Sequence, residues 1–173
     1  MTVTFYDASA GAYLQVLDAV ANILEKGGAW AAEQGVDPQD IVEYRLAEDM
    51  MPFHFQIESV AHHSWGAVQG MQSGQFSPPS FAMDKNYAGL QGLVNEARDG
   101  IRSLSEEDVN ALADGSLIFS LGERQLPFTN KNFLTSFSLP NFYFHATTTY
   151  DMLRIKGVTL GKMDFLGQIK VGT

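Results

Sequence analysis

The sequence predicts an all-α fold, specifically a four-helix bundle with a small β-hairpin before the last long helix. Long segments carry apolar side chains at helical spacing, and short runs rich in Gly, Pro or capping residues separate most of them. The chain has 173 residues, of which 45% are hydrophobic, so it is long enough and apolar enough to bury one substantial core. We therefore expect a single domain over residues 1–173.

The first helix is expected to start after Asp7, an N-cap candidate, and to run to about residue 26. Its apolar stripe comprises Tyr13, Val16, Leu17, Val20, Ile23 and Leu24. Gly27-Gly28 should weaken or bend this helix, and residues 29–32 extend it towards a stop at Gly35. Asp37-Pro38 then starts a short helix, because Asp caps well and Pro suits the first helical position.

Pro52 opens the second long helix, and Gly70 and Gly74 mark its end. Its helical stripe is the most regular in the chain: Phe53, Ile57, Val60, Ala61, Ser64, Val68 and Met71. Residues 72–86 contain Ser-Pro-Pro-Ser and are expected to form a long loop. A third helix fits residues 87–104, and Ser105 caps a short acidic helix after it.

The hairpin is predicted from Leu117, Phe119 and Leu121, which recur at period two before a turn at Gly122-Glu123. Residues 124–128 form its second strand, where Pro127 suits a sheet edge. Thr129 caps the last long helix, which should stop at Gly157 and be kinked at Pro140. Beyond it, Phe165-Leu166 is expected to pack against the bundle.

Composition excludes several classes of function. The net charge is -9 and the 11 basic residues are scattered, which argues against nucleic-acid binding. The chain has no cysteine, so disulfides, thiolate nucleophiles, iron–sulfur clusters and cysteine-type zinc sites are excluded. No stretch approaches 18 apolar residues and no signal peptide is evident, so we expect no membrane span and a cytoplasmic location.

Histidines are the strongest candidates for chemistry. Of the four, His54, His62 and His63 lie on the second long helix and His145 lies on the last. At 100° per residue, His62 falls opposite the apolar stripe and should face solvent, and His54 lies at one edge of the stripe. His63 lies at the other edge with Gln56, and this pair is the most able to reach a cleft between helices.

His145 follows Pro140 by about one turn and shares a helix face with Asn141, Thr148 and Met152. One hypothesis is that His63 and His145 face each other and bind a divalent ion, with water and Gln56 or Asn141 completing the shell. Tyr150 or Gln56 would orient a substrate. The alternative is two partly buried histidines with ordinary hydrogen-bond partners. No HExxH or HxxxH motif is present, and catalytic zinc usually has three protein ligands.

The remaining candidates are weaker. Ser136 and Ser138 lack the strand-to-helix elbow and the orienting acid that Ser-His catalysis needs. Glu58 and Asp151 are expected to be solvated carboxylates. The aromatic run Phe142, Tyr143 and Phe144 is typical of a core or an interface.

The last helix and the tail carry a recognisable pattern. It comprises Leu-Pro-Asn-Phe-Tyr-Phe-His-Ala-Thr-Thr-Thr-Tyr at residues 139–150, Leu153-Arg154, Gly157, and Leu-Gly-Lys-Met-Asp-Phe-Leu-Gly at residues 160–167. Asp7-Ala8-Ser9 and Asp49-Met50-Met51-Pro52 with Gln56 add to it. With this pattern the chain resembles uncharacterised-domain family nineteen ninety-three, of bacteria and fungi, within the DinB/YfiT-like superfamily.

This resemblance implies a four-helix bundle, often a homodimer, with a cleft in which many relatives hold zinc or nickel on three histidines. Those relatives include thiol-dependent transferases and hydrolases. One ligand comes from the second helix and two, spaced i and i+4, come from the last. Only His63 and His145 match here, because Asn141 and Thr149 stand four residues either side of His145.

Two functions follow from these observations. Because a third ligand is missing, we favour a non-catalytic homodimer, a binding or stress-related protein whose cleft holds a small apolar molecule or nothing. The alternative is a metal-dependent transferase or hydrolase that acts on a small molecule and uses zinc or nickel at His63 and His145. The ligand-cleft candidates are Gln56, Asn141, Thr148 and Tyr150.

Overall fold

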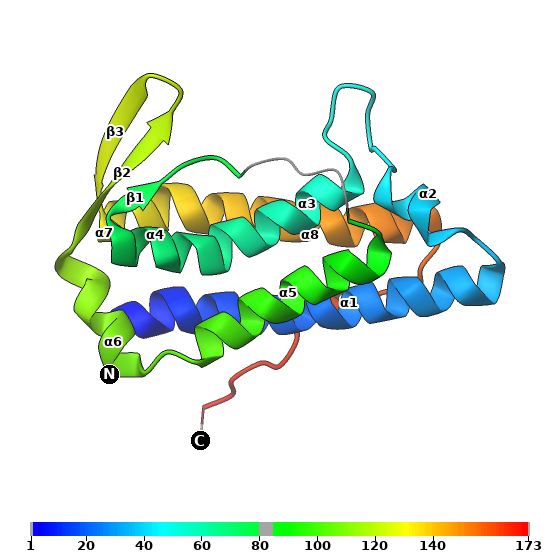
Figure 1. The fold of residues 1–173 in the computed structure, drawn as a ribbon. Helices are drawn as coiled ribbons and strands as arrows, with labels where there is room; N and C mark the ends of the chain where they lie inside the picture. The colour runs from blue at the N-terminus through cyan, green and yellow to red at the C-terminus, as the bar shows by residue number, and fades with distance from the viewer. Residues whose placement is uncertain (1, 80–84, 173) are drawn as a thin grey trace.

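A computed structural model of the chain describes residues 2–79 and 85–172. The fold is mostly helical, with a small sheet at one end (Figure 1). Helix α3 (Phe53–Ala61), which leads into α4 (Ala67–Ser73), packs along α8 (Leu139–Lys156), and α1 (Ala12–Gln34) packs along α5 (Tyr87–Arg102). The apolar stripes of these helices meet in one core. None of the described helices is both long and apolar enough to cross a membrane.

The start of the first helix differs from the prediction. Thr4 caps it, because the Thr4 hydroxyl accepts from the Asp7 N–H (3.1 Å) and the Asp7 carboxylate accepts from the Thr4 N–H (3.0 Å). Asp7 thus lies in the first turn, within a π-helical segment η1 (Asp7–Gly11). The helix also runs through Gly27-Gly28 to Gln34, and Gly35 ends it at φ 65°.

Gly27 and Gly28 give room to a side chain of a neighbouring helix. A Cβ on Gly28 would lie 3.3 Å from Cε1 of Tyr87 on α5, and a Cβ on Gly27 would meet the Tyr87 hydroxyl. That hydroxyl donates to the Leu24 carbonyl (2.8 Å). The glycines are therefore explained by close packing, and the helix continues through them.

The second long helix is confirmed, including its start after Pro52 and its end at Gly74. Its predicted stripe is buried throughout. A π-helical turn η2 (His62–Gly66) joins α3 to α4, which the sequence did not indicate. The short helix α2 (Pro38–Val42) is capped as expected, because the Asp37 carboxylate accepts from the Gln39 N–H (2.9 Å).

The sheet contains the predicted hairpin and one further strand. Strands β2 (Ser116–Leu121) and β3 (Arg124–Thr129) pair antiparallel around a turn with Gly122 at φ 58°. The additional strand β1 (Gln75–Phe76) pairs parallel with β2, inside the segment expected to be a loop. Two residues are too few for a periodic signal. Residues 80–84 of that expected loop lie outside the described residues.

Ser105 and Thr129 cap later helices as predicted, and Asn86 is a further cap that the sequence analysis did not name. Asn86 caps α5, Ser105 caps α6 (Glu106–Ala111), and a short 3-10 turn η3 (Leu112–Asp114) follows. Thr129 caps α7 (Asn130–Phe133), which continues through a π-helical turn η4 (Leu134–Ser138) into α8. The π-turn lies immediately before Pro140, which lacks an N–H donor, so the helix accommodates the proline by local widening of its backbone.

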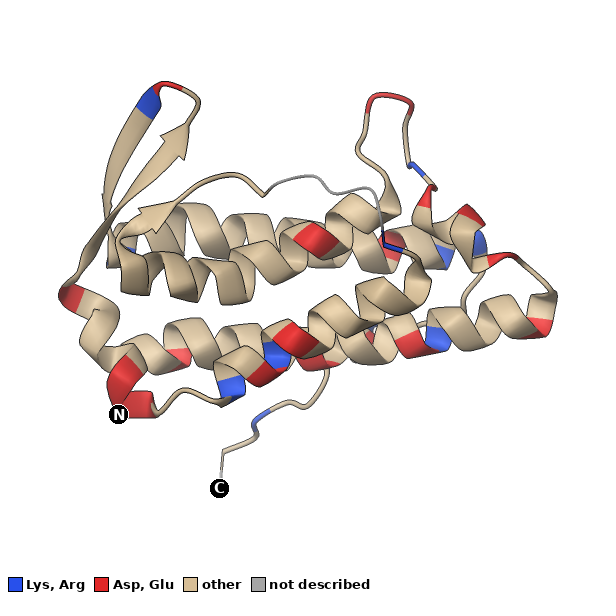
Figure 2. Ribbon diagram, in the orientation of Figure 1, with Lys and Arg blue, Asp and Glu red and all other residues tan. Residues whose placement is uncertain are grey.

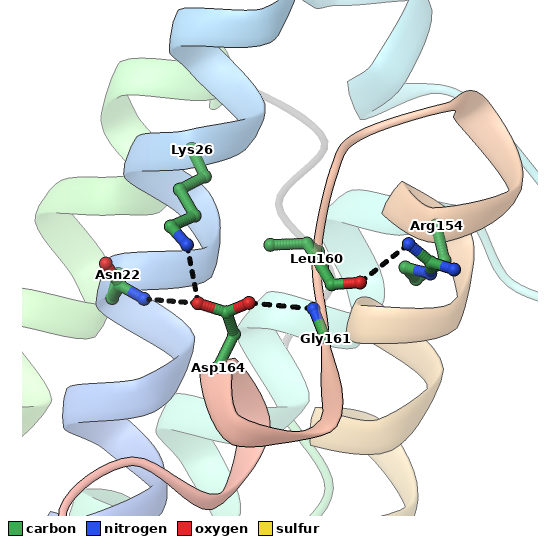
Figure 3. Close-up of polar contacts among 6 residues, drawn as sticks. All are labelled: Asn22, Lys26, Arg154, Leu160, Gly161 and Asp164. Atoms are coloured by element: carbon green, nitrogen blue, oxygen red, sulfur yellow. Dashed lines mark hydrogen bonds and ion pairs between the residues drawn. The ribbon is translucent and has the colours of Figure 1, made fainter.

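The tail packs down as expected. Helix α9 (Lys162–Leu166) lies against α1, and Phe165 contacts Tyr150 with ring centroids 6.1 Å apart. The Asp164 carboxylate accepts from Lys26 Nζ (2.6 Å), Asn22 Nδ2 (3.4 Å) and the Gly161 N–H (2.8 Å), as Figure 3 shows. These bonds fasten the tail to α1.

Candidate functional site

Gln56, His63 and His145 come together at the seam between α3 and α8. Gln56 is almost fully buried, and its Nε2 donates to the Met51 carbonyl (3.0 Å). The Gln56 Oε1 therefore faces His145 and accepts from its Nδ1 (2.8 Å). Because Nδ1 of His145 carries the proton, Nε2 of the neutral ring is left as an acceptor. The side chains of Gln56 and His145 therefore meet across the seam, a contact that the sequence analysis did not specify.

His63 lies beside His145 at the same seam. The two ring centroids are 6.0 Å apart and the ring planes differ by 8°. His63 is 7% exposed, and its Nδ1 has no hydrogen-bond partner among the described residues. A buried polar atom without a partner costs about 1–3 kcal/mol, which makes this atom a candidate contact for a ligand.

Both imidazoles are held in the neutral form. Burial, with smaller contributions from His62 and His145, lowers the pKa of His63 to about 3. Burial also lowers the pKa of His145 to about 4. Neutral imidazoles donate or accept hydrogen bonds and ligate metals, but at such pKa values they are weak bases at neutral pH.

A buried hydroxyl network positions the backbone of His63. Ser138 Oγ donates to the His63 carbonyl (2.7 Å), and the Tyr13 hydroxyl lies 2.5 Å from Ser138 Oγ. Since Ser138 donates to His63, Tyr13 donates to Ser138. The two π-turns η2 and η4 meet here. The sequence analysis named Tyr13 as part of an apolar stripe and Ser138 as a weak nucleophile candidate, and it missed the supporting role of both.

Aromatic side chains form the walls of the seam. The His63 ring lies 5.7 Å from Phe137 and 5.9 Å from Phe76, measured between centroids. The His145 ring lies 5.6 Å from Phe55 and 5.2 Å from Phe144. The two imidazoles therefore sit in largely apolar surroundings, which is the physical origin of their lowered pKa values.

The other predicted cleft residues have local partners. The Asn141 amide donates to the Phe137 carbonyl (2.7 Å), and Thr148 Oγ1 donates to the Phe144 carbonyl (2.8 Å). Tyr150 packs against Phe165 on the tail side of α8. Their contact with a ligand stays a prediction.

Two expectations about the second helix are wrong. His62 is half-buried, because the chain at β1 folds back over it: its Nε2 donates to the Ser77 carbonyl (2.8 Å) and its ring stacks on Phe76 at 4.4 Å. Glu58 is 7% exposed and is not a solvated carboxylate. Its Oε1 lies 3.9 Å from Nδ1 of His54, which is equally buried.

A three-ligand metal centre does not fit the residues at the seam. Thr149, four residues after His145, is fully buried and its Oγ1 donates to the His145 carbonyl (2.9 Å). Asn141, four residues before it, is bonded to its own helix. Within residues 2–79 and 85–172, no group of three or more His, Asp or Glu is placed to hold a metal ion. The seam supplies two imidazoles.

Comparison with known proteins identifies the family. The model of the family described as "Domain of unknown function (DUF1993)" matches residues 5–166. The chain belongs to this family. A crystal structure of a DinB family member from Shewanella denitrificans superimposes with a TM-score of 0.80, covering 97% of this chain and 94% of that one. The identity is 24%, so this likeness shows a shared fold. No curated protein matches the chain.

Proposed function

We propose that this DUF1993 domain is a non-catalytic homodimer, built on a DinB-type four-helix bundle, that binds a small apolar molecule at the α3–α8 seam. The observation that supports the proposal most strongly is the neutral protonation state of the two histidines. With pKa values of about 3 and 4, His63 and His145 remain neutral at pH 7. A general base works best with a pKa near the working pH, so these groups suit recognition better than proton transfer.

The chemistry of the seam favours a ligand with an aromatic or aliphatic body and one hydrogen-bond donor. Phe55, Phe137 and Phe144 supply apolar contacts, and His145 Nε2 supplies an acceptor whose direction Gln56 fixes. His145 is only partly buried, so this acceptor is within reach of a ligand from solvent. Gln56 then orients His145, and Asn141, Thr148 and Tyr150 remain the further predicted contacts.

A metal-dependent transferase or hydrolase is the second candidate function. One specific observation favours it: His63 Nδ1 is buried without a partner among the described residues, beside a second neutral imidazole. Neutral imidazole is the form that ligates zinc or nickel, so each ring is ready to bind. This reading requires the other ligands to come from water or substrate.

Elemental analysis of protein purified without an affinity tag separates the two functions. We expect much less than one equivalent of zinc or nickel per chain in the parent protein. His63→Ala and His145→Ala should then have equally low metal contents. One equivalent in the parent, lost in either variant, would establish the metal-dependent alternative.

The homodimer is supported by an uncharged, partly apolar surface at the hairpin end. Within residues 125–150 only Lys131 is charged, leaving the histidine aside, and residues 59–83 contain no Asp, Glu, Lys or Arg. Figure 2 shows charges along α1 and α5, whereas α4 carries none and the hairpin carries them only at its tip. Phe144 is 57% exposed, Leu126 46% and Tyr143 40%. Such a surface is typical of an interface between copies.

Light scattering after size-exclusion chromatography tests this part of the proposal. Phe144→Glu should convert the dimer to a monomer, because a carboxylate would be buried at the interface. Ile155→Glu is the matched control, since Ile155 is also on α8 and 65% exposed but lies among charged neighbours. A parent protein that is monomeric at about 100 µM would refute the dimer.

A further inference from the structure

Each imidazole of the seam leaves one nitrogen open to a ligand. Nδ1 of His145 is bonded to Gln56, and Nδ1 of His63 is buried without a partner among the described residues. Within residues 2–79 and 85–172, Nε2 of neither ring makes a hydrogen bond, and neither Nε2 is a fully buried atom. A ligand at the seam therefore meets the Nε2 edges of both rings.

The two rings carry their protons on different nitrogens. His145 is protonated on Nδ1, because Gln56 Oε1 accepts that proton, so its Nε2 is an acceptor. In His63, an N–H at Nδ1 would be a buried donor without an acceptor. Buried donors of this kind are rarer in proteins than buried acceptors without a donor. The favoured tautomer of His63 therefore has its proton on Nε2, where water or a ligand can accept it.

The seam thus presents a donor, His63 Nε2–H, beside an acceptor, His145 Nε2. The two rings are nearly parallel, with planes 8° apart and centroids 6.0 Å apart. A hydroxyl oxygen about 2.8 to 2.9 Å from each of two nitrogens spans up to about 5.7 Å between them. One hydroxyl group can therefore accept from His63 and donate to His145. An ether oxygen only accepts and a ring N–H only donates, so each would leave one of the two nitrogens unpaired.

We propose that the seam selects alcohols and phenols, that is, neutral molecules with a hydroxyl group on an aliphatic or aromatic body. The hydroxyl lies between the two Nε2 atoms, and the body packs on Phe55 and Phe144, whose rings lie 5.6 and 5.2 Å from that of His145. A charged ligand is disfavoured, because the walls are apolar and the neutral rings offer no opposite charge. The proposal rests on the function proposed for the seam and names its ligand class.

The tautomers can be measured without any ligand. Long-range proton–nitrogen correlation spectra of protein with isotope-labelled histidine, recorded at about pH 7.5, distinguish a ring protonated on Nδ1 from one protonated on Nε2. We expect Nδ1–H for His145 and Nε2–H for His63, with the single variants His63→Phe and His145→Phe assigning the signals. A His63 ring protonated on Nδ1 would overturn this proposal and leave the function proposed for the seam intact.

Four probes that share a phenyl ring test the selection of the hydroxyl. Phenol both donates and accepts, aniline chiefly donates, anisole only accepts, and toluene does neither. Shifts of the imidazole signals on titration give each affinity. We expect phenol to bind with a Kd on the order of 1 mM, as suits so small a ligand. It should bind at least about fivefold more tightly than aniline or anisole, which each lack one hydrogen bond, and toluene should bind most weakly.

Substitutions of single histidines separate the two hydrogen bonds. His63→Phe removes the donor, so phenol and anisole should each bind about fivefold more weakly while aniline is unaffected. His145→Phe removes the acceptor, so phenol and aniline should weaken while anisole is unaffected. His62→Gln, which keeps a donor for the Ser77 carbonyl outside the seam, is the matched control and should leave all affinities unchanged.

The outcomes distinguish this proposal from the function on which it rests. Equal affinities of the parent protein for phenol and aniline, or for phenol and anisole, would overturn the selection of a hydroxyl while the seam remained a ligand site. A His63→Phe variant that weakens phenol and aniline alike would overturn the donor role of His63. The absence of a saturable response to all four probes would overturn the proposal together with the ligand-binding function of the seam.

Discussion

The two seam histidines should make the stability of the protein strongly dependent on pH. In the unfolded chain, histidine has a pKa of about 6.5. Burial in the folded chain lowers the pKa of His63 to about 3 and that of His145 to about 4. Below pH 6.5 the unfolded chain therefore binds protons that the folded chain does not bind. The free energy of unfolding is therefore highest above pH 6.5 and decreases progressively as the pH falls towards 4.

The size of the loss follows from the pKa shifts. At pH 5 the solution pH lies about 1.5 units below the pKa of each histidine in the unfolded chain, while both histidines are still neutral in the folded chain. At about 1.4 kcal/mol per unit, each destabilises the folded state by about 2 kcal/mol. Because His145 is only partly buried, we expect about 3 to 4 kcal/mol for the pair, relative to pH 7.5. This is a large fraction of the stability of an ordinary domain.

Urea denaturation, followed by circular dichroism at about pH 7.5, 6.5, 5.5 and 5.0, measures this loss across the pKa of histidine in the unfolded chain. The control is a His63→Gln/His145→Gln variant, which retains His54 and His62 and so isolates the contribution of the seam. The variant should lose about 3 to 4 kcal/mol less than the parent between pH 7.5 and 5. If parent and variant lose the same free energy of unfolding, the seam histidines are not held neutral and the account of the site is wrong.

Three further predictions concern the packing of the helices and the attachment of the tail. Gly100→Ala should destabilise the protein by about 1 to 2 kcal/mol in urea denaturation, because the new Cβ would lie 2.6 Å from the Trp65 ring. Gly92→Ala on the same helix meets nothing within 4 Å and should stabilise by up to about 1 kcal/mol; the opposite ranking would refute the packing argument. Ser138→Ala should lower the free energy of unfolding by about 2 to 3 kcal/mol, because it removes the hydrogen-bond partner of the buried Tyr13 hydroxyl and His63 carbonyl. A loss under about 0.5 kcal/mol would contradict that network. Asp164→Asn should increase amide hydrogen exchange in α9 without altering α3, and unchanged exchange in α9 would show that its carboxylate does not fasten the tail.

Most of the helical framework was predictable because its signals are local. The stripe beginning at Phe53 repeats at 3.6 residues, and caps such as Asp37, Ser105 and Thr129 satisfy backbone donors within their own turn. The hairpin was equally readable from its period-two run and the glycine turn. In each case the residues that determine the element are neighbours in sequence.

The elements that were missed depend on distant partners. Strand β1 has two residues and forms only because β2, some forty residues later, offers it an edge. The π-turns η2 and η4 are local insertions that meet across the bundle, where Ser138 of η4 donates to the His63 carbonyl of η2. The pair Gly27-Gly28 predicts a weakened or bent helix, but its glycines make room for the Tyr87 ring, which lies on another helix.

Three residues of the candidate site, Gln56, His63 and His145, were predictable from the sequence, but the chemistry of the site was not. Helical phase alone placed His63 and Gln56 on one edge, and the structure brings both to His145. Helical phase could not show that Gln56 would accept a hydrogen bond from Nδ1 of His145, or that burial would lower the pKa values of both histidines. The tail around Asp164 belongs to the pattern that predicted the family, and in the structure it attaches α9 to α1.

The central claim is that His63 and His145 form a neutral recognition pair and not a metal centre. Calorimetric titration of tag-free, chelator-treated protein with Zn²⁺ and with Ni²⁺ tests this most directly, using the His63→Ala/His145→Ala variant as the baseline. The account predicts that parent and variant are indistinguishable at submicromolar affinity. Binding of one equivalent of either ion at submicromolar affinity, present in the parent and absent in the variant, would contradict it.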